Sequence, residues 1–339
     1  MKASESTILE ALSTVPPFPP VAVRLLSLLT NPNVEVQQVA ELISSDPTFT
    51  ARLLQCVNSY EFGLANPVSN VQQAVALVGM ERTRRVTVAH ATAAYAKAAW
   101  QTAELRRCWQ HTVATAVLSD EIAQCCEAFT DVAFTAGIMH DIGRLGLLVA
   151  YPQEYERIIL TATERCLDLL DFEHEEFGMD HAEAGRVLAK LWGLPIELGI
   201  VAGRHHDGCE GTELDLVRIV HVACRLADVL GYDVAHPVVR VGVESVLAEL
   251  PARARARMQR TPAELCSRIE QRILEYDSDT AEPPATPQVP VVEPATPEPL
   301  LDQKPEMPRK YSAISIVLTA AIALGVLNIL AAILLWKSH

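Results

Sequence analysis

Hydrophobic positions along residues 1–276 recur mainly at spacings of three and four, the period of an amphipathic helix. Two clear runs are Val71, Ala74, Val75, Val78 and Ala184, Val187, Leu188, Leu191. Alternation of the kind expected for strands is almost absent, and no internal repeat of fixed period is found. The pattern predicts an all-α fold, a bundle of many helices.

Three sites carry the residues that favour the start of a helix. They are Asp46 with Pro47, Ser69 with Gln72, and Asp180 with Glu183. An acidic or hydroxyl side chain at the N-cap accepts hydrogen bonds from free backbone N–H groups, and proline suits the first helical position. Each site precedes an apolar helical run, so we predict that a helix begins there.

Residues 311–336 form an uncharged apolar run. At about 1.5 Å per residue this run can cross about 30 Å of hydrocarbon. Arg309 and Lys310 precede it and Lys337 follows it, as interface anchors do. We predict a single transmembrane helix that acts as a C-terminal tail anchor; the alternative is a long buried core helix.

Residues 277–310 are rich in Pro, Glu, Thr and Val, a composition that buries too little apolar surface to fold. We predict a disordered linker. Since no secretory leader precedes the helical part, we expect a single-pass protein of the inner (cytoplasmic) membrane whose N-terminal domain faces the cytoplasm.

The formal net charge of −14 spreads acid over the chain and would repel phosphate backbones. We therefore expect no nucleic-acid partner. The eight cysteines form no CxxC pair, which favours reduced core residues in the cytosol. Two basic clusters, residues 82–85 and 253–260, are typical of solvated helix faces.

Several histidines and aspartates form a candidate metal cluster. They are His111, His140, Asp141, His181, His205, His206 and Asp228. Imidazole nitrogens and carboxylate oxygens suit divalent Mn, Fe, Zn or Mg, and such an ion can lower the pKa of bound water. A lone histidine is more often a core residue than a ligand, so the joint pattern carries the prediction. A buried Asp141 needs a cationic partner, which is either a metal ion or Arg144.

Seven segments in order resemble the HDOD domain, from about residue 13 to about residue 230. They are PPFPPVAVRLLSLL, ISSDPTFTARLLQCVNSYEFG, NVQQAVALVGMERTRRV, WQHTVATA, FTAGIMHDIGRLGLL, DHAEAGRVLAKLWGLP and RHHD. The resemblance implies a helical bacterial signalling module, an offshoot of the HD metal-dependent phosphohydrolases. It also implies a helical subdomain at about 13–100, an HD-like subdomain at about 101–230 and a helical extension at 231–276.

Carried over residue by residue, the HD pattern of metal ligands falls on His111, His140, Asp141 and Asp228. The related HD-GYP phosphodiesterases use further histidines, which would fall on His181, ahead of Gly185, and on His205 or His206.

Two departures from the HD-GYP pattern weigh against hydrolysis of cyclic di-GMP. The chain reads HHDGCEGTELD where those enzymes have DGxGYP, and Arg144 stands where they carry lysine. Simple metal binding remains open.

The leading hypothesis is a membrane-tethered signalling module that acts on a protein partner, with or without a bound metal or nucleotide, and without turnover. The alternative is a metal-dependent phosphohydrolase or cyclic-nucleotide phosphodiesterase that uses the HD residues. A third hypothesis is a scaffold without ligand, which predicts that the histidines lie apart in space.

Overall fold

A computed structural model describes residues 5–29, 33–59, 67–97, 102–207, 214–235 and 241–278. Within these ranges the chain forms helices and no strand, which confirms the all-α prediction. The described helices belong to one structural unit. The predicted transmembrane helix and almost all of the predicted linker lie outside the described residues.

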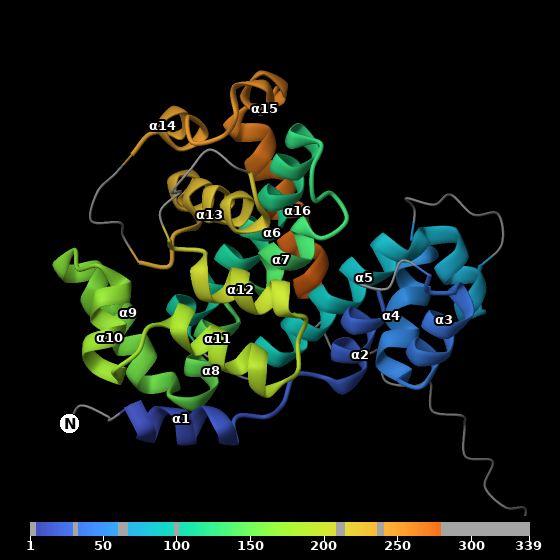
Figure 1. Ribbon diagram of the computed structural model, residues 1–339, viewed down its shortest axis with the longest axis horizontal. Helices are drawn as coiled ribbons and strands as arrows, with labels where there is room; N and C mark the ends of the chain where they lie inside the picture. Colours follow the sequence, from blue (N-terminus) through green and yellow to red (C-terminus); the bar gives the residue numbers. More distant parts are fainter. Residues whose placement is uncertain are drawn as a thin grey trace, which may run out of the picture. The chain divides into compact units, whose positions relative to one another are not determined.

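The N-terminal helices include a group of four that pack on one another, α2 to α5 (Figure 1). Their bounds are α1 Glu5–Thr14, α2 Pro20–Leu29, α3 Val36–Ser44, α4 Pro47–Val57 and α5 Val71–Lys97. Residue Gly79 interrupts α5 with a φ of 80°, a conformation that glycine adopts without steric cost. The helix is therefore kinked, and its second half continues toward the C-terminal helices.

Two of the three predicted helix starts are confirmed, and the third is shifted by one residue. The Asp46 side chain accepts from two backbone N–H groups at the start of α4, and Asp180 forms a capping box with Glu183. At α5, however, Asn70 rather than Ser69 accepts from the backbone N–H of Gln73. Asparagine is as good a cap as serine, so the two adjacent residues compete for the position.

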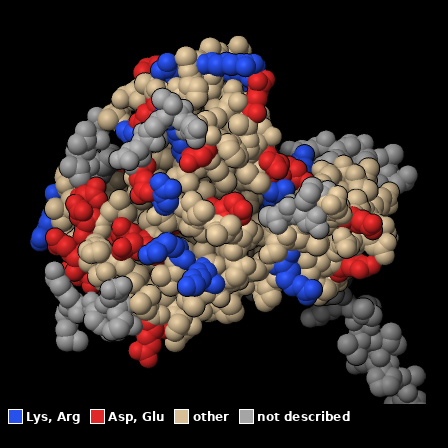
Figure 2. All heavy atoms as spheres, viewed as in Figure 1, with Lys and Arg blue, Asp and Glu red and all other residues tan. Residues whose placement is uncertain are grey.

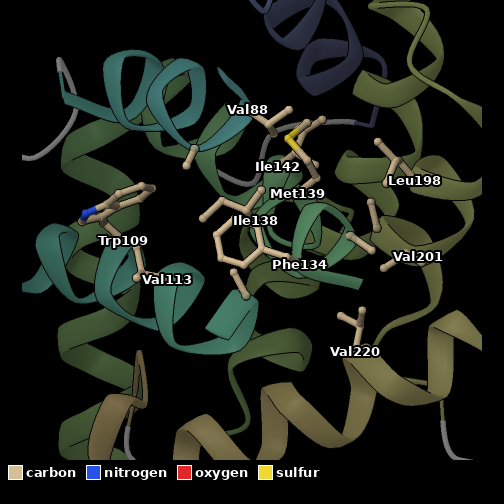
Figure 3. Close-up of a cluster of buried hydrophobic side chains, with 14 of the residues drawn as sticks. Val88, Trp109, Val113, Phe134, Ile138, Met139, Ile142, Leu198, Val201 and Val220 are labelled. Carbon is tan, nitrogen blue, oxygen red and sulfur yellow. The ribbon is translucent and has the colours of Figure 1, made fainter. Parts of the chain in front are cut away.

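The remaining helices include a central short helix, α7, on which α5, α6, α12 and α13 pack. Their bounds are α6 Ala103–Cys126, α7 Ala133–Met139, α8 Ile142–Ala150, α9 Pro152–Arg165, α10 Leu169–Phe177, α11 His181–Leu191, α12 Ile196–Arg204, α13 Leu216–Ala227, α14 Val243–Leu247, α15 Ala252–Arg257 and α16 Pro262–Ser278. Side chains from α5, α6, α12 and α13 converge on Phe134, Ile138 and Met139 of α7 (Figure 3). Because α7 is buried on all sides, the residues at its end are held deep inside the bundle.

Among the described residues, the stretch Ala133–Ala150 has the length and composition of a membrane span. It covers α7 and α8, and 89% of it is buried within the bundle. Burial by neighbouring helices accounts for its apolar character, so this stretch belongs to the core.

The first basic cluster is partly buried in ion pairs, whereas the second is largely exposed, as predicted for a solvated face, and also forms ion pairs. In the first, Arg84 is buried beside Glu81 at 3.4 Å, and Arg85 contacts Asp120 at 2.6 Å. The second cluster begins within α15, where basic side chains lie at the surface (Figure 2). There Arg257 pairs with Glu127 at 2.6 Å, tying α15 to the end of α6.

Candidate metal centre

The break between α7 and α8 places two candidate ligands side by side. Helix α7 ends at Met139 and α8 begins at Ile142, so His140 and Asp141 lie between them. Asp141 has a φ of −95° and a ψ of 21°, which turn the chain between the helices. Both side chains are buried, Asp141 being 1% exposed. The local sequence thus fixes the pair in the core, where an ionised carboxylate needs partners.

A close approach of two helices brings a third candidate ligand to this pair. A Cβ added to Gly143 of α8 would lie 2.0 Å from the His181 carbonyl oxygen and 2.2 Å from the backbone nitrogen of Gly185. Glycine therefore lets the backbones of α8 and α11 touch, and His181 at the start of α11 reaches Asp141.

Four imidazole rings surround the Asp141 carboxylate. The distance from Oδ1 is 3.3 Å to Nε2 of His181 and 3.5 Å to Nε2 of His205. The distance from Oδ2 is 3.6 Å to Nε2 of His140 and 4.0 Å to Nε2 of His111. Residues from α6, the α7–α8 break, α11 and the end of α12 thus converge, which contradicts a scaffold with scattered histidines.

Three of these rings are oriented by backbone carbonyls. The Nδ1 contacts are His111 to Tyr232 O at 2.9 Å, His140 to Gly137 O at 2.6 Å, and His205 to Ala202 O at 3.0 Å. Since a carbonyl only accepts, we assign the ring proton to Nδ1 in each case. The Nε2 lone pairs then point toward Asp141, as in the rings that bind metal ions in proteins.

Three buried polar atoms at this point have no hydrogen-bond partner among the described residues. They are Nε2 of His140, Nε2 of His205 and Oδ1 of Asp141. Their ligand atoms lie within 4.8 Å of one another. Buried acceptors are rarely left unsatisfied, and a divalent cation would satisfy all three at once. The residues present therefore fit a divalent metal ion.

The protonation states agree with this fit. Burial alone would raise the pKa of Asp141, but Arg144, His140 and His181 hold that pKa well below its usual range. Burial, aided by neighbouring imidazoles, lowers the pKa of His140 well below its ordinary value, and burial also lowers that of His205. At neutral pH the rings of His140 and His205 are thus neutral beside an ionised Asp141, the state in which imidazole and carboxylate bind metals.

Arg144 is a cationic partner of Asp141. It is one of the two alternative partners predicted from the sequence, the other being a metal ion. Its Nε lies 2.8 Å from Asp141 Oδ2 and its Nη2 lies 2.9 Å from His181 Nε2. The Nδ1 of His181 donates to Glu173 Oε2 at 2.6 Å, so its Nε2 accepts from the guanidinium. The lone pair of His181 is therefore already engaged.

His206 lies at the edge of the centre. Its Nε2 is 2.9 Å from His181 Nε2, the same atom that Arg144 contacts. Burial lowers the pKa of His206 well below its ordinary value, and the neighbouring rings of His205 and His181 add to this effect. His181, His205 and His206 form a second set of candidate ligands, with the guanidinium beside it.

Asp228 contacts Nδ1 of His111, whereas Nε2 of that ring faces Asp141, so Asp228 is not among the groups that surround the Asp141 carboxylate. It begins a π-helical turn, Asp228–Tyr232, and its Oδ1 is 3.4 Å from His111 Nδ1. Burial raises its pKa to about 6. In this geometry Asp228 can orient His111, and its role as a direct metal ligand stays a prediction.

Two residues of the centre, Cys224 and Glu173, were not predicted from the sequence. The Cys224 Sγ lies 3.4 Å from His111 Nε2, and burial raises the pKa of this thiol well above its ordinary value, so the thiol donates to the ring. Glu173 is fully buried and holds both Nδ1 and the backbone N–H of His181. Cys224 precedes Asp228 by four residues, a spacing that places both on one face of a helix and could have indicated Cys224 from the sequence. No sequence pattern indicated Glu173.

Comparison with family models identifies the family of this chain. The model of the HDOD domain matches residues 15–208. The fold is similar to an HDOD domain protein of unknown function from Geobacter sulfurreducens, with a TM-score of 0.62 and 22% identity over 80% of this chain and 97% of that one.

Two further solved structures share the fold. A candidate signal transduction protein from Marinobacter aquaeolei VT8 has a TM-score of 0.64 and 19% identity, over 82% of this chain and 62% of that one. A candidate phosphohydrolase from Shewanella amazonensis SB2B has a TM-score of 0.55 and 22% identity, over 81% and 98%. These identities show the fold alone.

A curated relative from Treponema pallidum (strain Nichols), an uncharacterized protein, is 23% identical over 206 residues. The match covers 60% of this chain and 39% of the relative, so the chain spans about two fifths of that protein's length.

Proposed function

This chain belongs to the HDOD domain family, whose model covers more than half of its residues, and on that premise we propose that it is a signalling module which acts through protein contacts rather than turnover. We further propose that it holds one divalent metal ion on His140, Asp141 and His205, with His111 adjacent. The partner would be a signalling protein.

The observation that carries this proposal is the position of the Arg144 guanidinium. It contacts Asp141 Oδ2 and His181 Nε2, two atoms that a second metal ion would need. A buried arginine stays charged at any pH of interest and would repel a cation placed beside it. The geometry thus supports a centre for one ion, not two.

Burial of the ligands supports a structural or sensory role for that ion. Each of His111, His140, Asp141 and His205 is 3% exposed or less, so a substrate phosphate has little access. A bound divalent ion supplies Lewis acidity and lowers the pKa of a water ligand. The residues themselves join α6, the α7–α8 break and α12, so occupancy would stabilise their mutual arrangement.

The alternative of an HD-type metal-dependent phosphohydrolase has one specific observation in its favour. His111, His140 and Asp141, three of the four positions of the HD pattern, converge in the described structure, and Nε2 of His205 joins them. This alternative requires metal-dependent hydrolysis, which the first hypothesis excludes.

Membrane tethering is a further part of the proposal. It rests on the uncharged run 311–336 and on the Pro-rich composition of the preceding segment. A tether would confine the module to the membrane surface and raise its effective concentration for partners on that surface.

The deciding experiment measures metal content and hydrolysis on the same samples of the full chain, purified in detergent. Elemental analysis is combined with hydrolysis of bis(p-nitrophenyl) phosphate, for wild type, His140→Ala and the control His90→Ala. His90 lies on α5, packed edge-on against Phe49, away from the centre. We expect about one ion per chain in wild type and His90→Ala, and loss of the ion in His140→Ala.

Hydrolysis decides between the two functions. We expect the same low background rate in all three proteins. Turnover that disappears in His140→Ala would replace the signalling proposal with the phosphohydrolase. Absence of metal from the wild type, even after incubation with Mn²⁺, Fe²⁺ or Zn²⁺, would refute the metal centre.

A further inference from the structure

A cavity of about 490 Å³ lies apart from the metal centre, where the N-terminal helices meet the C-terminal helix. Its walls come from α4, α5, α6, α7 and α16, and α16 packs on both α5 and α6. The lining residues that matter here are Arg52, Arg82, Arg85, Asp120, Phe134, Arg268, Arg272, Glu275 and Tyr276. This volume falls within the range of about 300–1,000 Å³ that small-molecule sites occupy.

The charge of this lining is opposite to that of the whole chain. Five arginines and two acidic residues line the cavity, whereas the chain carries a net charge of −14. Like charges around one cavity repel each other, so the fold must offset this arrangement with carboxylates or with a bound anion.

Carboxylates hold three of the arginines in fixed positions. Arg85 contacts Asp120 at 2.6 Å and Glu81 at 2.5 Å. Arg272 contacts Glu275 at 2.5 Å. Arg268 of α16 contacts Glu121 of α6 at 2.8 Å. These pairs position the guanidinium groups, as the supporting contacts of a preformed site do.

Arg52 completes the basic wall from α4. Its Nη1 donates to Gln55 Oε1 at 3.1 Å, a neutral acceptor that also lines the cavity. Burial lowers the pKa of Arg52, yet a guanidinium remains charged at neutral pH. A cation is therefore held in a partly buried wall of the cavity.

We infer that this cavity binds a small polyphosphate anion, free or as part of a nucleotide. The planar guanidinium fork matches phosphate oxygens in pairs, and arginine is the side chain that proteins favour for this contact. Phe134, over which Arg85 stacks at 5.2 Å, and Tyr276 give the same cavity an apolar part beside the guanidinium groups.

The location gives such a ligand a regulatory role. Arg52 and Arg85 belong to the N-terminal group of helices, whereas Arg268 and Arg272 belong to α16. One anion that contacts both sets would join α4 and α5 to α16. Binding would therefore stabilise one arrangement of these elements, which is how a small ligand shifts a signalling equilibrium.

The test is calorimetric titration of the full chain in detergent, at low salt, with inorganic pyrophosphate and with ATP as separate probes. The variants are Arg52→Gln and Arg272→Gln, with Arg52→Lys retaining the charge. Arg157→Gln is the matched control, because Arg157 pairs with Glu176 between α9 and α10 and lines no part of this cavity. His140→Ala separates this site from the metal centre.

We expect binding to weaken about tenfold in each Gln variant, the usual cost of one charge-assisted contact. Binding should weaken less in Arg52→Lys than in Arg52→Gln, because lysine keeps the charge but not the planar fork, and should be unchanged in Arg157→Gln and His140→Ala. Binding of pyrophosphate supports recognition of phosphate groups alone, and binding of ATP only supports recognition of a nucleotide. No binding of either probe, equal loss in Arg157→Gln, or loss in His140→Ala would overturn the inference.

Discussion

Asp141 is the residue at which the charges of the candidate metal centre meet. One carboxylate oxygen accepts from Arg144, and the other faces His181 and His205 without a hydrogen bond among the described residues. The guanidinium already compensates the buried negative charge, so Asp141 can stay ionised without a metal ion. Metal binding at this centre is therefore compatible with reversible occupancy, which a sensor requires.

The Asp141–Arg144 pair predicts a specific pH dependence of stability. Arg144 holds the pKa of Asp141 well below its usual range. Its contribution is fully present above the unfolded pKa of about 3.9 and is lost as the pH falls through the folded pKa. In metal-free Arg144→Gln, burial instead raises this pKa. We expect a loss of about 3–5 kcal/mol at pH 7 that shrinks as the pH falls through this raised pKa toward the lower folded pKa of the wild type. Urea unfolding from pH 3 to 8 measures it.

The control for this experiment is an exposed pair of the same chemistry. Arg157 is 54% exposed in its pair with Glu176. Its replacement by glutamine should cost less than about 1 kcal/mol, because solvent screens surface pairs. A loss in Arg144→Gln that is the same at pH 3 and pH 7 would show that the guanidinium acts through packing and not through the charge of Asp141.

At the residue scale the sequence predicted which side chains gather, but not how each one is used. The histidine pattern and the family resemblance named His111, His140, Asp141, His181 and His205, and the structure brings these together. Ring orientation depends on carbonyls elsewhere in the chain, which no local pattern encodes. For the same reason the contact of Asp228 with Nδ1 of His111, and the role of Glu173, could not be predicted.

At the scale of elements, the contact of α8 with α11 positions the centre. It depends on Gly143, because a Cβ there would overlap backbone atoms at 2.0 and 2.2 Å. Backbone cannot move aside as a flexible side chain can, so Gly143→Ala should separate the two helices and withdraw His181 from Asp141. We expect a loss of about 3 kcal/mol or more in the free energy of unfolding. Urea denaturation gives this value.

A second glycine offers the matched control. A Cβ added to Gly242, which precedes α14, would meet no atom within 4 Å, and the φ of −86° is one that any residue adopts. Gly242→Ala should change stability by less than about 1 kcal/mol. Equal effects of the two substitutions would mean that the loss does not arise from the helix contact, since the lower backbone entropy of alanine in the unfolded chain favours folding at both positions.

Element boundaries were predictable where one residue dominates the start of a helix. Asp46 and Asp180 each stand alone as good caps, and both predictions are confirmed. At α5, Ser69 and Asn70 are adjacent and chemically equivalent caps, so the sequence could not separate them. The helix α16 also continues to Ser278, so that it includes the first two residues of the predicted linker.

At the scale of the whole molecule, the family resemblance predicted the helical class and the order of segments. It gave no sign of the basic cavity. Arg82 and Arg85 looked like part of a solvated helix face, since their neighbours on α4 and α16 are distant in sequence. Packing between distant segments created the site, and periodicity within one helix carries no information about such packing.

Tethering is a property of the whole chain and can be tested by fractionation. The uncharged run 311–336 predicts that the full chain sediments with membranes and resists extraction with alkaline carbonate. A variant with Leu324→Arg and Leu327→Arg should move to the soluble fraction, because each central arginine costs about 2.5–3.5 kcal/mol of insertion free energy. The matched variant Leu324→Ala with Leu327→Ala should stay with the membrane. If the arginine variant also remained there, attachment would have to come from the folded helices or a bound partner, and the signalling module would reach the membrane without a tail anchor.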